Sequence, residues 1–311
     1  MQKKFKIAVL GIGGVGGYFG GKLAGFYAGS NEVEIIFIAR GANARAIKEV
    51  GLKIIAPEGV TTVHPDLVTD DPAAIGVADL LICCTKAFDV EAGLLKYKNC
   101  IAEKTLVLPL LNGVDSRERI IKILPGANVC QGCVYVVSRL TEPGVITKTG
   151  KLNSLYFGSS VIDKSILQKI EQVLKVDNIN ATLDDQIEKT MWEKFFFISP
   201  MATITSYIDK TIGAILADEK SRDLLLHLLS ELKDVTEAKA IELPTGIIDL
   251  TLQKMESFPY EATSSMHDDF KHGNKTELDS LTGYVVMQGK QLRVPTPVYN
   301  NAYEVLNAKN K

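Results

Sequence analysis

The sequence lacks any long apolar run and any excess of charge of one sign. No apolar stretch approaches the roughly 18 residues that a membrane-spanning helix needs, so we expect no membrane partner. The 35 lysines and arginines nearly balance the 37 aspartates and glutamates, which leaves a net charge of −2 at pH 7. With this balance and no long block of like charge, we expect no nucleic-acid partner. The start Met1-Gln2-Lys3-Lys4 precedes only a short, glycine-broken apolar stretch, so we expect no signal peptide and a cytoplasmic protein.

Cysteine and histidine are also scarce. Five cysteines make an odd count in a chain of 311 residues, which does not predict a disulfide framework. Cys130 and Cys133 have the CxxC spacing of redox and zinc sites, but no second CxxC or HxxxH pair accompanies them. Because residues 129–137 have the pattern of a strand, we expect both thiols to pack in a core. The four histidines show no metal-ligand spacing, so we expect no bound metal.

What the sequence does contain is a glycine-rich turn between a short apolar strand and a helix. The turn Gly11-Ile12-Gly13-Gly14-Val15-Gly16 directly follows the apolar run 5–10. In this pattern the first glycine permits a tight turn, the second lets the backbone approach a pyrophosphate, and the third lets helix and strand pack closely. The helix start presents free N–H groups to the phosphates. We therefore predict that a nicotinamide or flavin dinucleotide binds at Gly11, Gly13, Gly14, Val15 and Gly16.

The second predicted strand, residues 33–38, ends without an acidic residue. An acid at this place binds the ribose 2′-hydroxyl of NAD, but here Ala39 and Arg40 follow the strand. A guanidinium donates paired hydrogen bonds to phosphate oxygens and therefore suits the 2′-phosphate of NADP. The sequence favours NADPH over NADH. Two alternatives stay open: Arg40 is a solvated loop residue, or Arg45 shares its role.

The apolar pattern divides the chain into two domains. Up to about residue 180, short strands alternate with helical or loop segments, which predicts a mostly parallel sheet. These strands are 80–84, 105–110, 129–137 and 155–158. Beyond Asp185 the helical period dominates, and the predicted helices are 186–208, 219–240, 260–270, 277–290 and 296–307.

We therefore predict an α/β fold class, with an N-terminal Rossmann-type dinucleotide-binding domain at 1–184 and an all-helical C-terminal domain at 185–311. The first domain is expected to bind NADP, and the second to hold the substrate and the catalytic residues. The leucine-rich segment 224–232 of the second domain has two interpretations. It is either part of the core or the seam of a homodimer.

Lys194 stands where the helical pattern asks for an apolar residue. It falls on the stripe Ile187, Met191, Lys194, Ile198, among aromatic neighbours. A partly desolvated ammonium group can give up a proton, so Lys194 is a candidate catalytic acid. The alternative is a lysine that extends its charged end to solvent along the apolar surface.

Glu277 and Ser265 are further candidates in the helical half. Glu277 begins a predicted helix and shares a face with Leu281 and Tyr284, so it can accompany Lys194 as a hydrogen-bond partner or substrate ligand. Ser265 and Asp269 lie one turn apart, which puts a hydroxyl and a carboxylate on one helix face. The structural alternatives are a glutamate that favours a helix start and a solvated polar face.

Taken in order, eight motifs resemble those of the ketopantoate reductases (2-dehydropantoate 2-reductases), and they span essentially the whole chain. They are Ile7-Ala8-Val9-Leu10-Gly11-Ile12-Gly13-Gly14-Val15-Gly16, Arg40, Thr85-Lys86-Ala87, Asn112-Gly113-Val114, Trp192-Glu193-Lys194, Ser264-Ser265-Met266 with Asp269, Thr276-Glu277-Leu278-Asp279, and Val294-Pro295-Thr296-Pro297. Most of these motifs are weak alone, and their order makes the resemblance specific.

The resemblance implies an oxidoreductase that reduces 2-dehydropantoate to (R)-pantoate with NADPH, on the route to pantothenate and coenzyme A. It implies that Lys194 is the proton donor and that Glu277 binds the substrate hydroxyl. Ser265 would contact the substrate, and Asn112 would lie beside the nicotinamide and the reacting carbonyl. Lys86 and Arg40 would bind the cofactor.

Three positions depart from the family pattern. Ile198 and Thr282 replace asparagines that are frequent in the family, and Leu111 stands where a histidine can occur. A pocket with these residues is less polar, so a second hypothesis is a reductase of another branched 2-oxo acid. A third is a sensor module that binds NADPH without turnover.

Overall fold

The computed structural model describes residues 3–177 and 179–309, and the chain divides into two compact units. The first comprises Met1–Leu111 and Asp115–Ile187, and the second comprises Asn112–Val114 and Glu188–Lys311. The short segment Asn112–Val114 therefore packs with the second unit although both its neighbours in sequence belong to the first.

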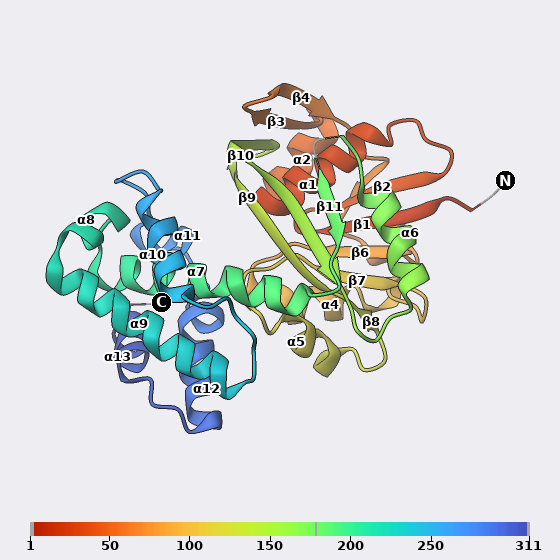
Figure 1. Cartoon of the computed structure of the whole chain (residues 1–311). Helices are drawn as coiled ribbons and strands as arrows, with labels where there is room; N and C mark the ends of the chain where they lie inside the picture. Colours follow the sequence, from red (N-terminus) through yellow and green to blue (C-terminus); the bar gives the residue numbers. More distant parts are fainter. Residues whose placement is uncertain (1–2, 178, 310–311) are drawn as a thin grey trace. The chain divides into compact units, whose positions relative to one another are not determined.

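The first unit contains a six-stranded parallel sheet in the order β5-β2-β1-β6-β7-β8 (Figure 1). Its strands are β1 (Phe5–Leu10), β2 (Val33–Ile38), β5 (Leu67–Thr69), β6 (Leu80–Cys83), β7 (Leu106–Pro109) and β8 (Asn128–Val129). This order matches that of dinucleotide-binding sheets, in which the winding direction reverses beside the first strand, here between β1 and β6. The predicted α/β fold class is confirmed.

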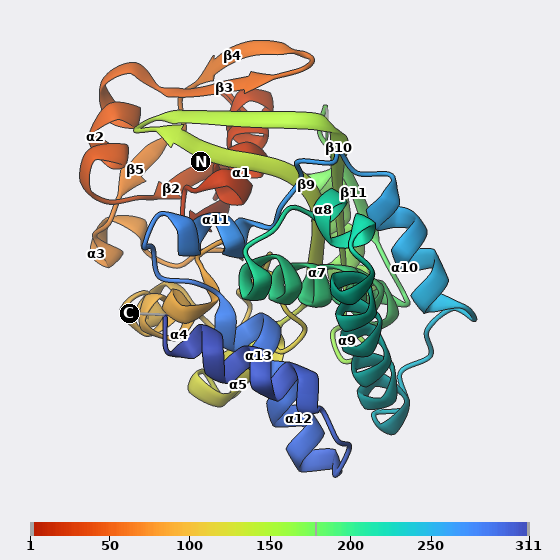
Figure 2. The ribbon, with the colours of Figure 1, turned by 90° about the vertical axis from the view of Figure 1, so that its left-hand side faces the viewer.

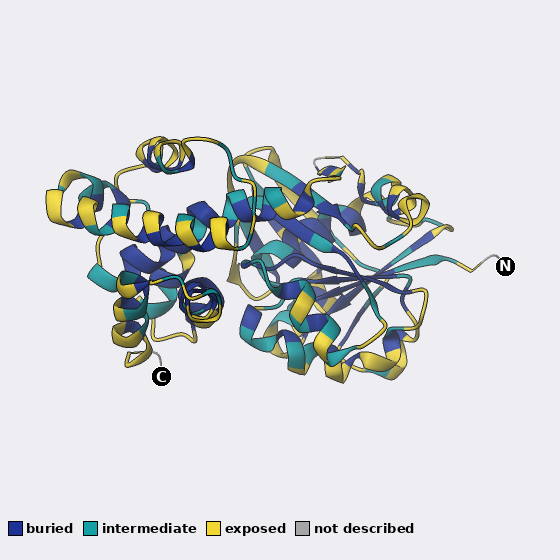
Figure 3. Cartoon of the chain, turned by 60° about the horizontal axis from the view of Figure 1, so that its bottom comes forward, coloured by how far each residue is buried: buried dark blue, intermediate teal, exposed yellow. Residues whose placement is uncertain are grey.

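Both faces of this sheet are buried, because successive side chains of a strand point to opposite sides. In β1, Ile7 and Val9 belong to one apolar cluster, and Ala8 and Leu10 belong to another. The helices and turns that connect the strands are α1 (Gly14–Phe26), α2 (Gly41–Val50), α3 (Pro72–Ile75), η1 (Ala87–Asp89), α4 (Val90–Lys96), η2 (Lys98–Cys100) and α5 (Ser116–Ile123). Figure 3 shows the central strands buried and the outer faces of the helices exposed.

A second, mixed sheet completes the first unit. Its strands are β3 (Leu52–Ala56), β4 (Gly59–Val63), β9 (Gln131–Glu142), β10 (Val145–Gly158) and β11 (Asn180–Leu183), and α6 (Lys164–Leu174) precedes β11. The order is β11-β10-β3-β4, with β9 antiparallel to β10. The predicted strands 129–137 and 155–158 were too short, and a mostly parallel sheet does not describe this part. Residues 139–142 of the hairpin are exposed and, apart from Leu140, polar, so the apolar pattern ends before the strand does.

The second unit is helical, as predicted. Its helices are α7 (Ile187–Ile208), α8 (Ile212–Ala217), α9 (Glu219–Ala238), α10 (Ile247–Glu256), α11 (Ser265–Lys271), the π-helical turn η3 (Asp279–Gly283), α12 (Tyr284–Leu292) and α13 (Pro297–Asn307) (Figure 2). The helix predicted at 260–270 begins only at Ser265. Ser264 ends the preceding loop by accepting a hydrogen bond from the backbone N–H of His267, as helix caps do. Helices α8 and α10 were not predicted.

Helix α9 supplies much of the core of this unit. Leu225, Leu228, Leu229 and Leu232 are fully buried in the helical cluster, so this face of 224–232 packs within the chain. The carboxylate of Glu231 accepts hydrogen bonds from the N–H groups of Val298 and Tyr299 and so caps α13. The homodimer stays a prediction. Within the described ranges, no helix is both long and apolar enough to cross a membrane.

Candidate active site

The glycine turn after β1 has the tight geometry that the sequence predicts. Gly11 has a φ of +92°, a region that side chains with a Cβ rarely adopt. A Cβ on Gly16 would overlap the carbonyl oxygen of Gly11. Close packing of α1 against the turn therefore requires glycine at both positions.

Gly13 and Gly14 differ in what surrounds them. A Cβ on Gly13 would meet no atom within 4 Å, whereas one on Gly14 would collide with the backbone carbonyl of Ser138 in β9. Gly13 is the N-cap of α1, and no side-chain hydrogen bond from this residue caps the helix. An open backbone beside an uncapped helix N-terminus fits a dinucleotide pyrophosphate.

Arg40 and Lys86 follow strands that flank β1. Arg40 lies two residues after the end of β2 and is the N-cap of α2, and Lys86 follows β6 as the N-cap of η1; both residues are exposed. Because adjacent parallel strands end at one edge of a sheet, the glycine turn, Arg40 and Lys86 share this edge. Arg45 is also exposed on α2, so its shared role stays open.

Asn43 has a role at this edge that the sequence did not predict. Its Nδ2 donates to the carbonyl of Ile12 at 2.8 Å, and its Oδ1 accepts from the N–H of Gly144 at 2.8 Å. The side chain thus ties α2 to the glycine turn and to the β9–β10 connection. A polar residue three positions after Arg40 was the only signal, and many exposed asparagines share it.

Three predicted residues come together within the second unit. Lys194 Nζ donates to Asn112 Oδ1 at 3.1 Å, and Asn112 Nδ2 lies 3.4 Å from Glu277 Oε2. Lys194 and Asn112 are half-buried, and Glu277 is buried with 6% of its surface exposed. A buried carboxylate and an ammonium group therefore flank one amide, which gives the centre both a proton source and hydrogen-bond acceptors.

The local structure explains how Glu277 is held. The N–H groups of Ser280 and Leu281 both donate to its backbone carbonyl at 3.1 Å, and the π-helical turn η3 starts two residues later. Single π turns inside helices are frequent at functional sites. The predicted helix at 277–290 is thus irregular at its start, close to the carboxylate.

Ser265 and Asp269 both lie on helix α11. Ser265 is the exposed first residue of α11, and Asp269 lies one turn later on the same short helix. Among the described residues, no hydrogen bond joins Ser265 to Lys194, Asn112 or Glu277. The substrate role of Ser265 stays a prediction.

The positions that depart from the family pattern are apolar or internally bonded. Ile198 is half-buried and packs against the helical core. The hydroxyl of Thr282 is fully buried and pairs with that of Thr203 at 2.8 Å. Leu111 is buried in a core of the first unit. None of the three side chains offers a free polar group.

The CxxC cysteines pack in a core, as predicted. Cys130 and Cys133 are both buried, and neither belongs to a disulfide among the described residues. Burial raises the pKa of the Cys130 thiol to about 12. A thiol that stays protonated is a poor nucleophile, which argues against redox chemistry at this pair.

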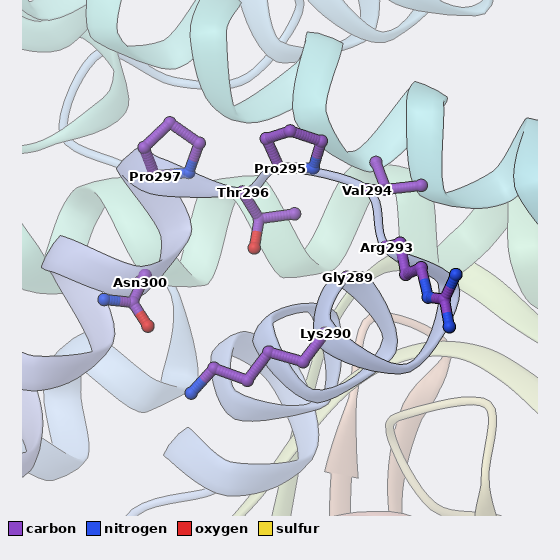
Figure 4. Close-up of a pocket in the computed structure, with 8 residues that line it drawn as sticks. All are labelled: Gly289, Lys290, Arg293, Val294, Pro295, Thr296, Pro297 and Asn300. Atoms are coloured by element: carbon purple, nitrogen blue, oxygen red, sulfur yellow. The ribbon is translucent and has the colours of Figure 1, made fainter.

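A surface hollow lies between α12 and α13, apart from these residues. It is lined by Gly289, Lys290, Arg293, Val294, Pro295, Thr296, Pro297 and Asn300. Figure 4 shows the side chains of Lys290 and Arg293 extending in different directions. The hollow includes none of the predicted site residues.

Comparison with known families accounts for both units. Residues 7–161 match the family described as ketopantoate reductase PanE/ApbA, and residues 186–310 match its C-terminal family. An uncharacterized oxidoreductase, YkpB, of Bacillus subtilis is 27% identical over 299 residues, which cover 96% of each chain.

Solved structures give the same relationship. A 2-dehydropantoate 2-reductase from Porphyromonas gingivalis is 35% identical, with a TM-score of 0.85 and coverage of 98% of this chain and 99% of the other. A D-mandelate dehydrogenase in a ternary structure with NADH and anilino(oxo)acetate is 25% identical, with a TM-score of 0.85 and 98% coverage of both chains.

Proposed function

This chain belongs to the ketopantoate reductase family of oxidoreductases, and from that premise we propose that it reduces 2-dehydropantoate to (R)-pantoate with NADPH. The reaction would serve pantothenate and coenzyme A biosynthesis. The observation that carries the proposal is the contact of Lys194 and Glu277 with the two ends of the Asn112 amide.

When bound, NADPH supplies the hydride that adds to the carbonyl carbon of the substrate. Negative charge then develops on the carbonyl oxygen, which needs a proton or a positive donor. The ammonium group of Lys194 supplies both. Glu277 accepts a hydrogen bond from the substrate hydroxyl, which orients the carbonyl. Asn112 holds Lys194 and lies beside the reacting carbonyl, and Ser265 contacts the substrate.

The residues of the first unit bind the cofactor in this proposal. The glycine turn at Gly11, Gly13, Gly14, Val15 and Gly16 holds the pyrophosphate. Arg40 pairs with the 2′-phosphate, which favours NADPH over NADH. Lys86 supplies a further positive charge. The open position at Gly13 and the exposure of Arg40 and Lys86 support these roles.

The test is NADPH oxidation by the purified protein with ketopantoate, compared with a panel of other 2-oxo acids and with NADH. Selective turnover of ketopantoate with NADPH is expected. Turnover of another 2-oxo acid but not of ketopantoate would reject ketopantoate as the substrate. Equal activity with NADH and NADPH would reject the proposed contact of Arg40 with the 2′-phosphate.

A second candidate is the reduction of a 2-oxo acid with a more apolar side chain. Ile198 supports it, because this half-buried residue lies one turn after Lys194 on α7. The relative described as a D-mandelate dehydrogenase suggests that the panel include an aromatic 2-oxo acid. Faster turnover of such acids than of ketopantoate would favour this candidate.

A sensor that binds NADPH without turnover is the third hypothesis. The joint presence of Lys194, Glu277 and Asn112 in one hydrogen-bonded group argues against it. Binding of NADPH with no oxidation by any acid of the panel would favour it.

A further inference from the structure

Helix α11 is short and is flanked by irregular segments. It has seven residues, Ser265–Lys271, and residues 261–264 and 274–277 on either side form neither helix nor strand. A helix of this length has little stability of its own, so its position depends on tertiary contacts. Its first residue, Ser265, is the one that we propose to contact substrate.

Side-chain hydrogen bonds join this segment to α7 and to the residue that follows it. Ser264 Oγ lies 2.9 Å from Thr205 Oγ1, within α7. His267 Nε2 lies 2.7 Å from Asp209 Oδ1, directly after the last residue of α7. Both contacts lie within the second unit, and α7 is the helix that carries Lys194.

The contact with Asp209 is the hydrogen bond that the described residues offer to the buried imidazole of His267. Only 1% of the residue is exposed, and its Nδ1 is buried without a hydrogen-bond partner among the described residues. Because a buried Nδ1–H would lack an acceptor, Nε2 carries the hydrogen in the neutral ring, and this N–H donates a hydrogen bond to Asp209 Oδ1. The ring therefore has one polar attachment.

Asp209 adopts an unusual backbone conformation in this contact. Its φ is +51°, in the left-handed region that favours glycine and tolerates aspartate. The hydrogen bond from His267 is the largest cause that lowers the pKa of its carboxyl. The Lys271 ammonium lies 3.9 Å away, and Lys309 also faces the carboxylate. A glycine at position 209 would adopt this backbone conformation equally well, but it would lack the carboxylate that contacts His267.

We propose that the pair of His267 and Asp209 positions α11 against α7, and so sets Ser265 relative to Lys194 for substrate binding. Both are positioning residues, since they act through Ser265. This inference rests on the proposed function, because Ser265 matters only if a substrate binds there. It adds to that function two residues outside the motifs of the family resemblance.

The test compares His267→Phe, which keeps a buried ring without the hydrogen bond, with Asp209→Gly, which keeps the backbone conformation without the carboxylate. His267→Gln places an amide N–H near Nε2 and is the conservative rescue. His272→Gln is the matched control, because His272 is an exposed histidine at the end of the same helix. Two readouts are taken: hydrogen exchange of the α11 amides, and separate KM values for the 2-oxo acid and for NADPH.

We expect faster exchange at α11 in His267→Phe and Asp209→Gly, together with a rise of about tenfold in KM for the 2-oxo acid, as for the loss of one hydrogen bond to a charged group. KM for NADPH should not change, His267→Gln should recover most of the affinity, and the double variant should lose no more than either single one.

Unchanged hydrogen exchange of the α11 amides in both variants would show that the pair of His267 and Asp209 does not hold α11. Faster exchange with an unchanged KM for the 2-oxo acid would show that the pair does not position Ser265 for substrate binding. Failure of the proposed function is distinguishable, because the wild type would then turn over no acid of the panel, and the positioning role would be rejected with it.

Discussion

Lys194 Nζ donates a hydrogen bond to Asn112 Oδ1 across 82 positions of sequence. The other end of the same amide faces Glu277, which fixes which way the Asn112 side chain is turned. Asn112 therefore keeps its carbonyl for Lys194 and its NH₂ group for the carboxylate. An amide oxygen can hold the ammonium group without taking its proton, which fits the proton-donor role that we propose for Lys194.

Replacement of this donor tests its role. Lys194→Met should lower kcat by about 10²- to 10⁴-fold, the usual contribution of a positioned acid, because the methionine cannot protonate the developing alkoxide. Lys189→Met, on the same helix, is the control. The measurement is steady-state NADPH oxidation, with NADPH affinity by fluorescence titration. A kcat within threefold of the wild type would show that another group donates the proton.

Glu277→Gln keeps the size of the side chain and removes its charge. We expect KM for the 2-oxo acid to rise by roughly 10- to 100-fold, as for loss of a hydrogen bond to a charged group, because the substrate hydroxyl loses a charged acceptor. The affinity for NADPH should be unchanged. Isothermal titration with NADPH alone checks this expectation, and a large loss of NADPH affinity would contradict a substrate role.

Arg40→Met tests the choice of cofactor. Without the guanidinium, KM for NADPH should rise by at least about tenfold, as for a lost charge-assisted hydrogen bond, while KM for NADH should stay the same. Arg45→Met is the matched variant on the same helix. Both variants are assayed with both cofactors. If Arg45→Met raises KM for NADPH more than Arg40→Met does, Arg45 and not Arg40 binds the 2′-phosphate.

Gly13→Ala separates cofactor binding from folding. The new methyl group meets no protein atom within 4 Å, so the melting temperature should not change, whereas NADPH affinity should fall because the methyl group occupies the pyrophosphate's approach. Gly16→Ala is the comparison, because its methyl group would overlap the Gly11 carbonyl and should destabilise the fold. Wild-type affinity in Gly13→Ala would place the pyrophosphate elsewhere.

Glu171 links α6 to β11 and predicts a pH dependence of stability. Its carboxylate accepts a hydrogen bond from the Leu183 N–H at 3.0 Å, the largest cause that lowers its pKa, with Lys175 adding to the shift. A lowered pKa contributes stability above the unfolded-state value of about 4.3, and this contribution is lost as pH falls through the folded-state pKa. The gap in unfolding free energy between the wild type and Glu171→Gln should therefore shrink below about pH 4.

Urea unfolding at a series of pH values measures that gap. Glu103→Gln removes an exposed carboxylate of the same unit and serves as the control. A gap that stays constant down to pH 3 would mean that the charge of Glu171 does not contribute.

The parts of the fold that repeat a simple period could be predicted from the sequence. The buried strand β1 and the long helix α7 follow apolar patterns within a residue or two of their observed bounds. The full length of the β9–β10 hairpin could not be predicted, because residues 139–142 face solvent and do not alternate between apolar and polar side chains. Helix α8 has only six residues, too few for a clear period.

The candidate site divides in a similar way. Lys194 stood out because it interrupts an apolar stripe, but its contact with Asn112 joins distant segments that no local pattern connects. Asn112 was singled out only by resemblance to a family. Asn43 and His267 act through contacts with Ile12 and Asp209, and such contacts exist only after the chain has folded.

Because Asn112–Val114 packs with the second unit, a recombination between related genes at the boundary before Glu188 would separate residues that contact one another. A gene rearrangement that exchanged the chain from Glu188 onward between two relatives would transfer Lys194 and Glu277 together but would leave Asn112 with the other parent. The hybrid would then combine Lys194 and Glu277 from one parent with Asn112 from the other. Recombination just before Glu188 would therefore divide a hydrogen-bonded group between two parents.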